Sequence, residues 1–269
     1  MKKNKPHILL TNDDGIRSPG LWAAAGELSK IGYVTVAAPR DQSSGMGRSL
    51  PNTSDGIIRK ELMQVNGQEW NVHAVGGSPA QSVLHGVLEI SKHKPDLVVS
   101  GINYGENVGL GITISGTVGA AMEAAAMGIP SLAISLQTET QYHLTHSEDI
   151  DFSAAGYFTA YFAKILLEKK FSAEVDLLKV EVPSHATPET EWQVTRLSRH
   201  RYYQPVAAER ASWDLPGLIT YKEAAMLEQE GEDTDVYVLR KKKMVAVTPL
   251  NLDMTARIPL NDFDKFLRE

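Results

Sequence analysis

The sequence predicts an α/β fold with a mostly parallel sheet, helices on both faces, and a strand-rich carboxyl-terminal arm that protrudes from the core. Two observations predict it. Short apolar runs, of the kind that strands buried on both faces need, alternate three times with helical stretches in the first half of the chain. From about residue 180 onward the pattern becomes strand-rich and more polar. The simplest account is one domain, residues 1–269, with a core in about residues 1–180 and an arm and terminal helix in about residues 181–269.

The first β-α-β unit lies at the amino terminus. Ile8, Leu9 and Leu10 form an unbroken apolar run, which indicates a buried strand. Residues 21–28 have helical composition, and residues 34–38 read as a strand that Pro39 closes.

Two further units follow. Residues 82–90 have helical periodicity and lead into a buried strand at residues 95–100. Residues 117–127 are rich in Ala, Met and Glu, end at Gly128, and lead into a strand at residues 131–135. Because crossovers between parallel strands are right-handed, the three units predict one parallel sheet that is covered on both faces.

The remaining elements are less regular. Residues 57–75 contain short alternating stretches that favour a hairpin at a sheet edge, and residues 152–167 form an amphipathic helix. In the arm we expect strands at residues 192–195, 236–239 and 244–247, a solvated hairpin turn at the basic run 240–243, and a short helix at residues 260–268.

Composition limits the classes of function. A net charge of −6 and a pI near 5.8 give no long-range attraction for nucleic acid. The apolar run behind the basic amino terminus ends at Leu10 and meets two aspartates, so we expect no secretory signal, no membrane span and a cytoplasmic location. The chain contains no cysteine, so any metal must be held by oxygen or imidazole, which favours a hard cation.

The most informative motif is Asn12-Asp13-Asp14-Gly15, which follows the first apolar run. An aspartate pair at the carboxyl end of a parallel strand lies where ligand crevices form in open sheets, and there it is suited to hold a cation. The same four residues are also an ordinary turn, and Asp is a common helix cap. Matching chemistry at other strand ends decides between the two interpretations.

Three other loops supply such chemistry. Residues 39–47 follow the second strand and contain Ser43 and Ser44, either of which can offer a hydroxyl ligand. Asn103 follows its strand by the same short interval as the aspartates, and its amide oxygen is a neutral hard ligand. Ser115-Gly116-Thr117 lies directly ahead of the third helix, whose start is a natural anion cradle.

The four loops together describe an oxygen-only site suited to one Mg²⁺ or Mn²⁺ ion. Without a metal, the aspartate pair would repel a phosphate group by about 1 kcal/mol or more per charge pair. With a metal, the ion polarises a phosphoryl oxygen and lowers the pKa of a bound water. The pattern therefore predicts metal-dependent hydrolysis of a phosphate ester.

Five motifs occur in order between residue 7 and about residue 256. They are Asn12-Asp13-Asp14-Gly15; Ala38-Pro39 followed by Ser44-Gly45; Ser100-Gly101-Ile102-Asn103 with Gly105, Asn107 and Gly109; Ser115-Gly116-Thr117-Val118; and Thr248-Pro249-Leu250 with Asp253 and Thr255. Together they resemble the SurE family (survival protein E) of metal-dependent nucleotidases, which are also called nucleoside monophosphate phosphohydrolases.

The resemblance implies a three-layer, Rossmann-like core and hydrolysis of nucleoside 5′-monophosphates, with 3′-monophosphates as a further substrate class. It implies that one divalent cation per subunit is ligated by Asp13, Asp14, Ser44 and Asn103, of which Asp13, Asp14 and Asn103 serve catalysis. The same motifs mark as substrate contacts Asn12, Gly45, Asn107, Ser115, Gly116 and Thr117. A homodimer or homotetramer, in which the carboxyl-terminal arm packs on a neighbouring subunit, is also implied.

This chain departs from the family pattern in two places. Where the family has an acidic residue and a tyrosine before Ser-Gly-Thr, it has Gly111-Ile112-Thr113-Ile114. Gly77-Ser78-Pro79-Ala80-Gln81-Ser82 replaces a more usual Gly-Thr-Pro-x-Asp-Cys. The expected metal ligands are present while the pocket wall differs, so the preferred substrate stays open.

Other functions predict other motifs. A dinucleotide-dependent oxidoreductase should carry Gly-x-Gly-x-x-Gly in its first loop, which this chain lacks. A haloacid dehalogenase-like phosphatase should carry Asp-x-Asp, whereas the aspartates here are adjacent. Two alternatives stay open: a non-catalytic, metal-dependent nucleotide-binding protein, and a phosphatase for a small ester that is not a nucleotide.

The histidines and arginines suggest no further site. His143 and His146 lie three residues apart in a polar stretch without helical pattern, and we interpret their spacing as incidental. We interpret Arg40, Arg48 and Arg201 as surface residues. The sequence identifies no acid for the leaving group.

Overall fold

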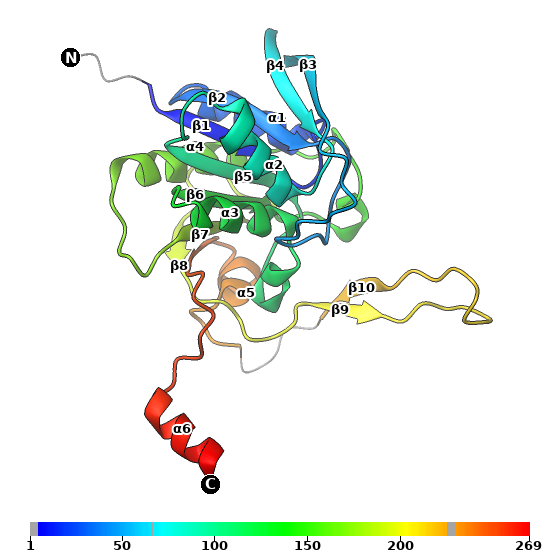
Figure 1. The fold of residues 1–269 in the computed structure, drawn as a ribbon, viewed down its shortest axis with the longest axis vertical. Helices are drawn as coiled ribbons and strands as arrows, with labels where there is room; N and C mark the ends of the chain where they lie inside the picture. Colours follow the sequence, from blue (N-terminus) through cyan, green and yellow to red (C-terminus); the bar gives the residue numbers. More distant parts are fainter. Residues whose placement is uncertain (1–4, 66, 225–229) are drawn as a thin grey trace.

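A central, mostly parallel sheet organises the protein (Figure 1). The computed structural model describes residues 5–65, 67–224 and 230–269. Within them, nine strands form one sheet in the order β3-β4-β2-β1-β5-β6-β7-β11-β8. Their bounds are β1 His7–Thr11, β2 Tyr33–Pro39, β3 Ile58–Val65, β4 Gln68–Val75, β5 Leu97–Tyr104, β6 Ser131–Leu136, β7 Leu177–Val182, β8 Trp192–Val194 and β11 Val245–Leu250.

The sheet departs from parallel pairing toward its two ends. Antiparallel pairs join β3 to β4 and β11 to β7, whereas the other neighbouring strands pair in parallel. The β3–β4 pair is the predicted edge hairpin. The α/β fold with a mostly parallel sheet is therefore confirmed.

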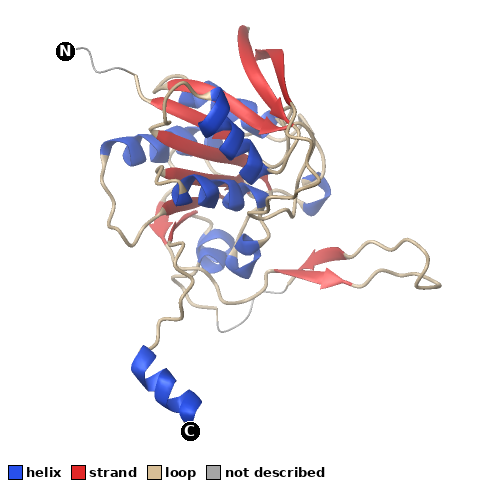
Figure 2. Cartoon of the chain, in the orientation of Figure 1, coloured by secondary structure: helices blue, strands red, loops and turns tan. Residues whose placement is uncertain are grey.

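Helices cover both faces of the sheet (Figure 2). Ile8 and Leu10 belong to a core with α1 (Pro19–Leu28) and α4 (Ser153–Glu168), whereas Leu9, between them, faces α2 (Pro79–His85) and α3 (Gly116–Ala126). Successive strand side chains point to opposite faces, so an unbroken apolar run is what a three-layer core requires.

Short polar signals set where two of these helices begin. The Ser115 side chain accepts a hydrogen bond from the Val118 N–H at the start of α3. At α2, Ser78 and Gln81 form a reciprocal capping box ahead of Pro79. Helical turns continue or connect the main elements at Gly86–Ile90, Gly109–Thr113 and Thr140–Tyr142.

One predicted strand in the arm is wrong. Residues 236–239 are helical: α5 (Asp235–Tyr237) continues into the turn Val238–Lys242. The Thr234 side chain caps this helix by accepting from the Tyr237 N–H, and Asp235 lies in its first turn, where the helix dipole favours an acid. Local capping thus outweighs the β-branched composition of the segment.

The predicted hairpin turn at the basic run 240–243 is also wrong. The run ends a helix, where cations complement the dipole, and Lys243 closes it in the left-handed conformation. Arg240 is only partly exposed and forms ion pairs with Glu106 and Glu223.

Two segments project from the body of the molecule (Figure 1). The hairpin of β9 (Tyr203–Val206) and β10 (Thr220–Glu223) extends outward, and α6 (Leu260–Arg268), the predicted terminal helix, lies beyond the end of the sheet. Both carry exposed apolar side chains, including Trp213, Leu218, Phe263 and Phe266. No helix of the described residues is both long and apolar enough to cross a membrane.

Candidate active site

The aspartate pair lies in a tight turn at the carboxyl end of β1. Parallel pairing places Thr11 beside Ser100 of β5, so the loops that follow these two strands lie next to each other. The Asn12 side chain shapes the turn, because its Nδ2 donates to the Gly15 carbonyl and its Oδ1 accepts from the Gly15 N–H. Asn12 is fully buried, and we assign it to the turn in place of a substrate contact.

Asp13 is packed against the start of α3. It accepts a hydrogen bond from the Thr117 hydroxyl, and a Cβ on Gly116 would lie 2.7 Å from the Asp13 Cβ, so only glycine permits this approach. Burial raises the pKa of Asp13 to about 6, although Thr117 and the backbone N–H groups of the helix start lower it. The helix start predicted as an anion cradle therefore already faces one anion of the chain itself.

Asp14 is buried beside it. Its carboxylate accepts from the Tyr104 N–H at 3.3 Å and from the Gln42 Nε2 at 3.3 Å. Burial, and then the charge of Asp13, raise the pKa of Asp14 well above its usual value. In the described part of the chain no ion pair includes either aspartate, so both carboxylates lack a counter-cation.

Asn103 and Ser44 bring neutral oxygens to the same place. The Asn103 Nδ2 donates to the carbonyls of Tyr104 and Gly105, at 3.1 and 2.6 Å, whereas no described group donates to its Oδ1, and the residue lines the pocket. Ser44 lines the same pocket as Asp13, and its hydroxyl accepts from the Gln42 Nε2. Ser43 does not line that pocket, and its hydroxyl donates to the Asp41 carbonyl.

The donor set fits a hard divalent cation. Two buried carboxylates with raised pKa values and no counter-cation gain most from a doubly charged ion, and Gln42 links Asp14 to Ser44 through one amide nitrogen. Within the described residues no three His, Asp or Glu side chains cluster as metal ligands. A cation here would therefore depend on the neutral oxygens of Ser44 and Asn103 as well.

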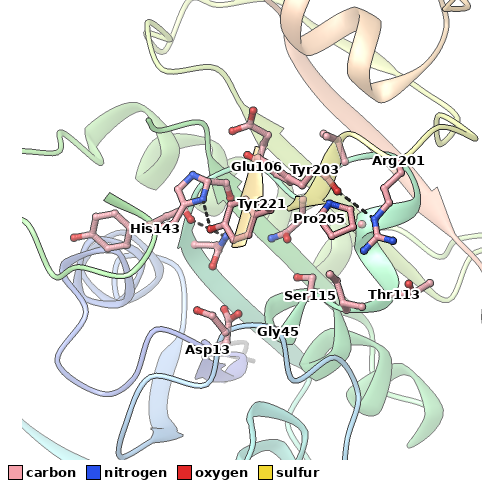
Figure 3. A pocket seen from close by; sticks show the side chains of 18 of the residues that line it. Asp13, Gly45, Glu106, Thr113, Ser115, His143, Arg201, Tyr203, Pro205 and Tyr221 are labelled. Carbon is pink, nitrogen blue, oxygen red and sulfur yellow. Dashed lines mark hydrogen bonds between the residues drawn. The ribbon is translucent and has the colours of Figure 1, made fainter. Parts of the chain in front are cut away.

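A pocket of about 600 Å³ opens over these groups (Figure 3). One side is polar and carries Asp13, Ser44, Gly45, Asn103, Asn107 and Ser115. Tyr221 and Tyr203 of the β9–β10 hairpin lie on the opposite side, and Figure 3 shows the Asp13 carboxylate pointing into the space below Tyr221. Gly116 and Thr117 lie just outside the pocket lining and contact Asp13.

His143 and His146 do not form a metal pair, since each ring contacts a different protein group, but both lie near the candidate site. The His146 Nε2 pairs with the Asp14 carbonyl at 2.8 Å. His143 lines the pocket, where its Nδ1 contacts the Tyr221 hydroxyl and its Nε2 the Thr138 carbonyl. Burial lowers the pKa of His143. Protein groups thus contact both ring nitrogens of His143, and His146 contacts the turn that carries the aspartates.

Arg201 is exposed, as expected for a surface residue, and it also lines the pocket. Its Nε donates to the Tyr203 carbonyl at 3.2 Å. The tyrosines and Arg201 follow the predicted core, in a segment whose pattern shows only strands. No local signal in the sequence places such a hairpin over a site made by β1 and β5.

A second buried network holds the loop after β5 that bears Asn107. Lys179, Glu181 and Asp235 are fully buried, and the Lys179 Nζ contacts Asp235 at 3.1 Å and Glu181 at 3.4 Å. The Asn107 N–H donates to Glu181 and its carbonyl accepts from Lys179, both at 2.9 Å. Burial lowers the pKa of Lys179, but its two acidic neighbours raise it further, above its ordinary value.

Proteins of one known family resemble this chain along most of its length. The family model described as survival protein SurE matches residues 8–204. The chain belongs to the SurE family. A protein named 5′-nucleotidase SurE from Thermococcus kodakarensis is 43% identical over 261 residues, which are 97% of this chain and 98% of that protein. The protein of the same name from Methanosarcina acetivorans is 39% identical over 273 residues, with 97% and 98% covered.

A solved SurE structure has the same fold. The crystal structure of the SurE protein from Aquifex aeolicus aligns with a TM-score of 0.74 and 30% identity, and the alignment covers 98% of this chain and 100% of that one. The resemblance carried by the five motifs is thereby confirmed.

Proposed function

We propose that this SurE chain is a divalent-metal-dependent phosphomonoesterase that hydrolyses nucleoside 5′-monophosphates to nucleoside and phosphate, with 3′-monophosphates as a further substrate class. One observation carries the proposal: two adjacent buried carboxylates have no cationic partner among the described residues, and one of them, Asp13, borders a pocket of nucleotide-accepting size. The relatives named 5′-nucleotidase SurE support the same activity.

In this proposal Asp13, Asp14, Ser44 and Asn103 hold one Mg²⁺ or Mn²⁺ ion per subunit, which supplies charge neutralisation and an activated water when bound. The chain's own groups orient the ester. Ser115 lines the pocket beside the proposed metal ligands, and Gly45, which has no neighbour within 4 Å of a notional Cβ, leaves the approach open to the phosphate. Asn107 lines the same wall.

The decisive experiment measures phosphate release from a panel of 5′- and 3′-mononucleotides and p-nitrophenyl phosphate. We expect turnover of 5′-mononucleotides that EDTA abolishes and Mg²⁺ or Mn²⁺ restores. Turnover that is indifferent to the chelator would remove the metal from the proposal. Tight nucleotide binding without turnover would indicate a non-catalytic nucleotide-binding protein, and turnover of p-nitrophenyl phosphate alone would indicate a phosphatase for other esters.

We further propose that the chain acts as one domain and assembles as a homodimer or homotetramer through its carboxyl-terminal arm. Exposed apolar side chains along α6, including Leu260, Phe263 and Phe266, support this, because isolated helices of this length are marginal in water unless they pack. Light scattering on the full chain and on a variant that ends at residue 253 tests it. We expect the truncated variant to lose subunits, and equal masses would exclude residues 254–269 as the contact.

A further inference from the structure

The pocket has two chemically different sides, and only one of them suits a phosphate. The polar side belongs to the loops after β1, β2 and β5. The other side is formed by Tyr203 and Tyr221 of the hairpin together with His143, and we call these three residues the aromatic wall. Pro205 and Ile219 extend the wall with further apolar surface.

The rings of the aromatic wall support each other. Tyr203 lies edge-on to Tyr221, with ring centroids 5.3 Å apart, and edge-on to His143 at 5.8 Å. The His143 and Tyr221 rings lie within 24° of parallel, at 6.1 Å. Mutual packing of this kind presents ring faces with little freedom to reorient, which lowers the entropic cost of binding a planar group.

His143 also fixes the wall relative to the polar side. Its ring lies directly on Gly105, where a Cβ would come within 2.3 Å of the Nε2, and Gly105 directly follows β5, which carries Asn103 near its end. The His143 carbonyl accepts from the Gln42 Nε2 at 3.0 Å, and Gln42 contacts both Asp14 and Ser44. The wall and the acidic groups are therefore connected through short polar contacts.

We infer that the aromatic wall is the subsite for the nucleobase, with Tyr221 as the ring against which the base stacks. This inference rests on the proposed function and deepens it, since it names the part of the substrate that the hairpin selects. Tyr221 is the suitable ring because it lines the pocket, is partly exposed, and has its hydroxyl held by His143. Arg201, which the Tyr203 carbonyl holds at the same pocket, suits the acceptor atoms at the edge of a base.

The test compares AMP with ribose 5-phosphate, which has the same phosphorylated sugar without the base. Base-aromatic stacking contributes about 1–3 kcal/mol per base, so we expect kcat/KM for AMP to exceed that for ribose 5-phosphate by about tenfold or more. In Tyr221→Ala this ratio should fall by about tenfold, mainly through KM for AMP. Tyr221→Phe keeps the ring and should keep most of the ratio.

Tyr157→Ala is the matched control, because Tyr157 is exposed to a similar extent on α4 and does not line the pocket. Its ratio should equal that of the wild type. A Tyr221→Ala variant with an unchanged ratio would overturn the inference. If Tyr221→Ala fails to fold, competition in the wild type decides: adenosine should inhibit ribose 5-phosphate hydrolysis and ribose should not, and equal behaviour of the two would overturn the inference.

Failure of the proposed function has a different signature. If no ester releases phosphate, calorimetry of AMP and ribose 5-phosphate in the presence of Mn²⁺ still compares the two ligands. Tighter binding of AMP that depends on Tyr221 would support the wall without catalysis, and equal binding would reject the wall.

Discussion

Two clusters of buried charge occur in this protein, and they are balanced differently. In the first, Lys179 contacts both Glu181 and Asp235, so the chain supplies its own cation. In the second, Asp13 and Asp14 are equally buried and contact only neutral donors. The first cluster holds a loop in place, whereas the second has no cationic partner among the described residues.

The difference separates a structural charge cluster from a binding site. Both clusters contain adjacent or facing carboxylates, and burial raises the pKa of Glu181 to about 7 much as it raises that of Asp13 to about 6. A perturbed pKa alone therefore does not identify the site. The lack of a cationic partner among the described residues, together with Ser44 and Asn103 at the same pocket as Asp13, is what supports the proposed metal site.

The largest expected effect is a loss of stability when Lys179, the cation of the first cluster, is replaced. Lys179→Met leaves two buried carboxylates, Glu181 and Asp235, without a cationic partner. Breaking a buried ion pair in this way lowers the free energy of unfolding by about 3–5 kcal/mol. Urea denaturation at pH 8 measures it. Lys164→Met, at an exposed lysine of α4, should change the unfolding free energy by less than about 0.5 kcal/mol. Similar values for the two variants would show that Lys179 does not balance the cluster.

Removing the Asp13 charge from the second cluster should impair activity and leave the fold intact, whereas removing Lys179 from the first cluster should impair folding. Asp13→Asn keeps the shape of the side chain but removes a proposed metal ligand, so we expect activity to fall at least about a hundredfold while the fold stays intact. Phosphate release and circular dichroism on the same samples measure the two properties. Asp41→Asn, at an exposed acid of a neighbouring loop, is the control. Near wild-type turnover in Asp13→Asn would mean that the cation is misplaced.

The sequence predicted the second cluster, that of Asp13 and Asp14, because its parts lie at strand ends. Apolar runs located β1 and β5, and polar residues directly after such runs must meet at one edge of a parallel sheet. Hence Asp13, Asn103 and Ser115 could be expected together before any coordinates. Between Ser43 and Ser44 the local sequence offered no choice, and the pocket lining distinguishes them.

The first cluster, that of Lys179, Glu181 and Asp235, and the aromatic wall could not be predicted in this way. Lys179 lies inside β7 among apolar neighbours, and its partner Asp235 comes from α5, a segment whose composition indicated a strand. Tyr221 and His143 meet only through the folding of the hairpin over the sheet edge. Contacts between elements distant in sequence, outside the repeated β-α-β pattern, leave no periodic signal.

A smaller effect should appear in the pH dependence of the metal-free protein. The pKa of Asp13 is about 6 in the folded state and about 4 in an unfolded chain, so the folded protein binds the extra proton between these values. Stability therefore falls as pH rises through this window, by about 2 kcal/mol for this group. Urea denaturation of the wild type and Asp13→Asn in EDTA at pH 4.5 and pH 8 measures the difference.

Asp13→Asn should be more stable than the wild type at pH 8, and the gap should narrow at pH 4.5. Glu181 titrates in the same direction in both proteins, so it cancels from the comparison. A gap that does not depend on pH would show that the Asp13 carboxylate is not disfavoured by folding. Adding Mn²⁺ at pH 8 should stabilise the wild type more than the variant, because binding to the folded state raises the unfolding free energy.

The smallest expected effect is on Mn²⁺ affinity, through the Thr117 hydroxyl that donates to Asp13 of the second cluster. Thr117→Val removes the hydroxyl that donates to Asp13 while keeping its volume, and this hydroxyl lowers the pKa of Asp13. Without it the carboxylate holds its proton more tightly, so Mn²⁺ affinity near pH 6 should fall about fivefold, in line with about 1 kcal/mol for one hydrogen bond. Thr159→Val is the control, since that buried hydroxyl donates to the Ala155 carbonyl within α4. Calorimetry should show the loss of Mn²⁺ affinity in Thr117→Val and not in the control. The loss should be smaller at pH 8, where Asp13 has released its proton. An equal loss at both pH values would mean that Thr117 acts on the position of Asp13 and not on its charge.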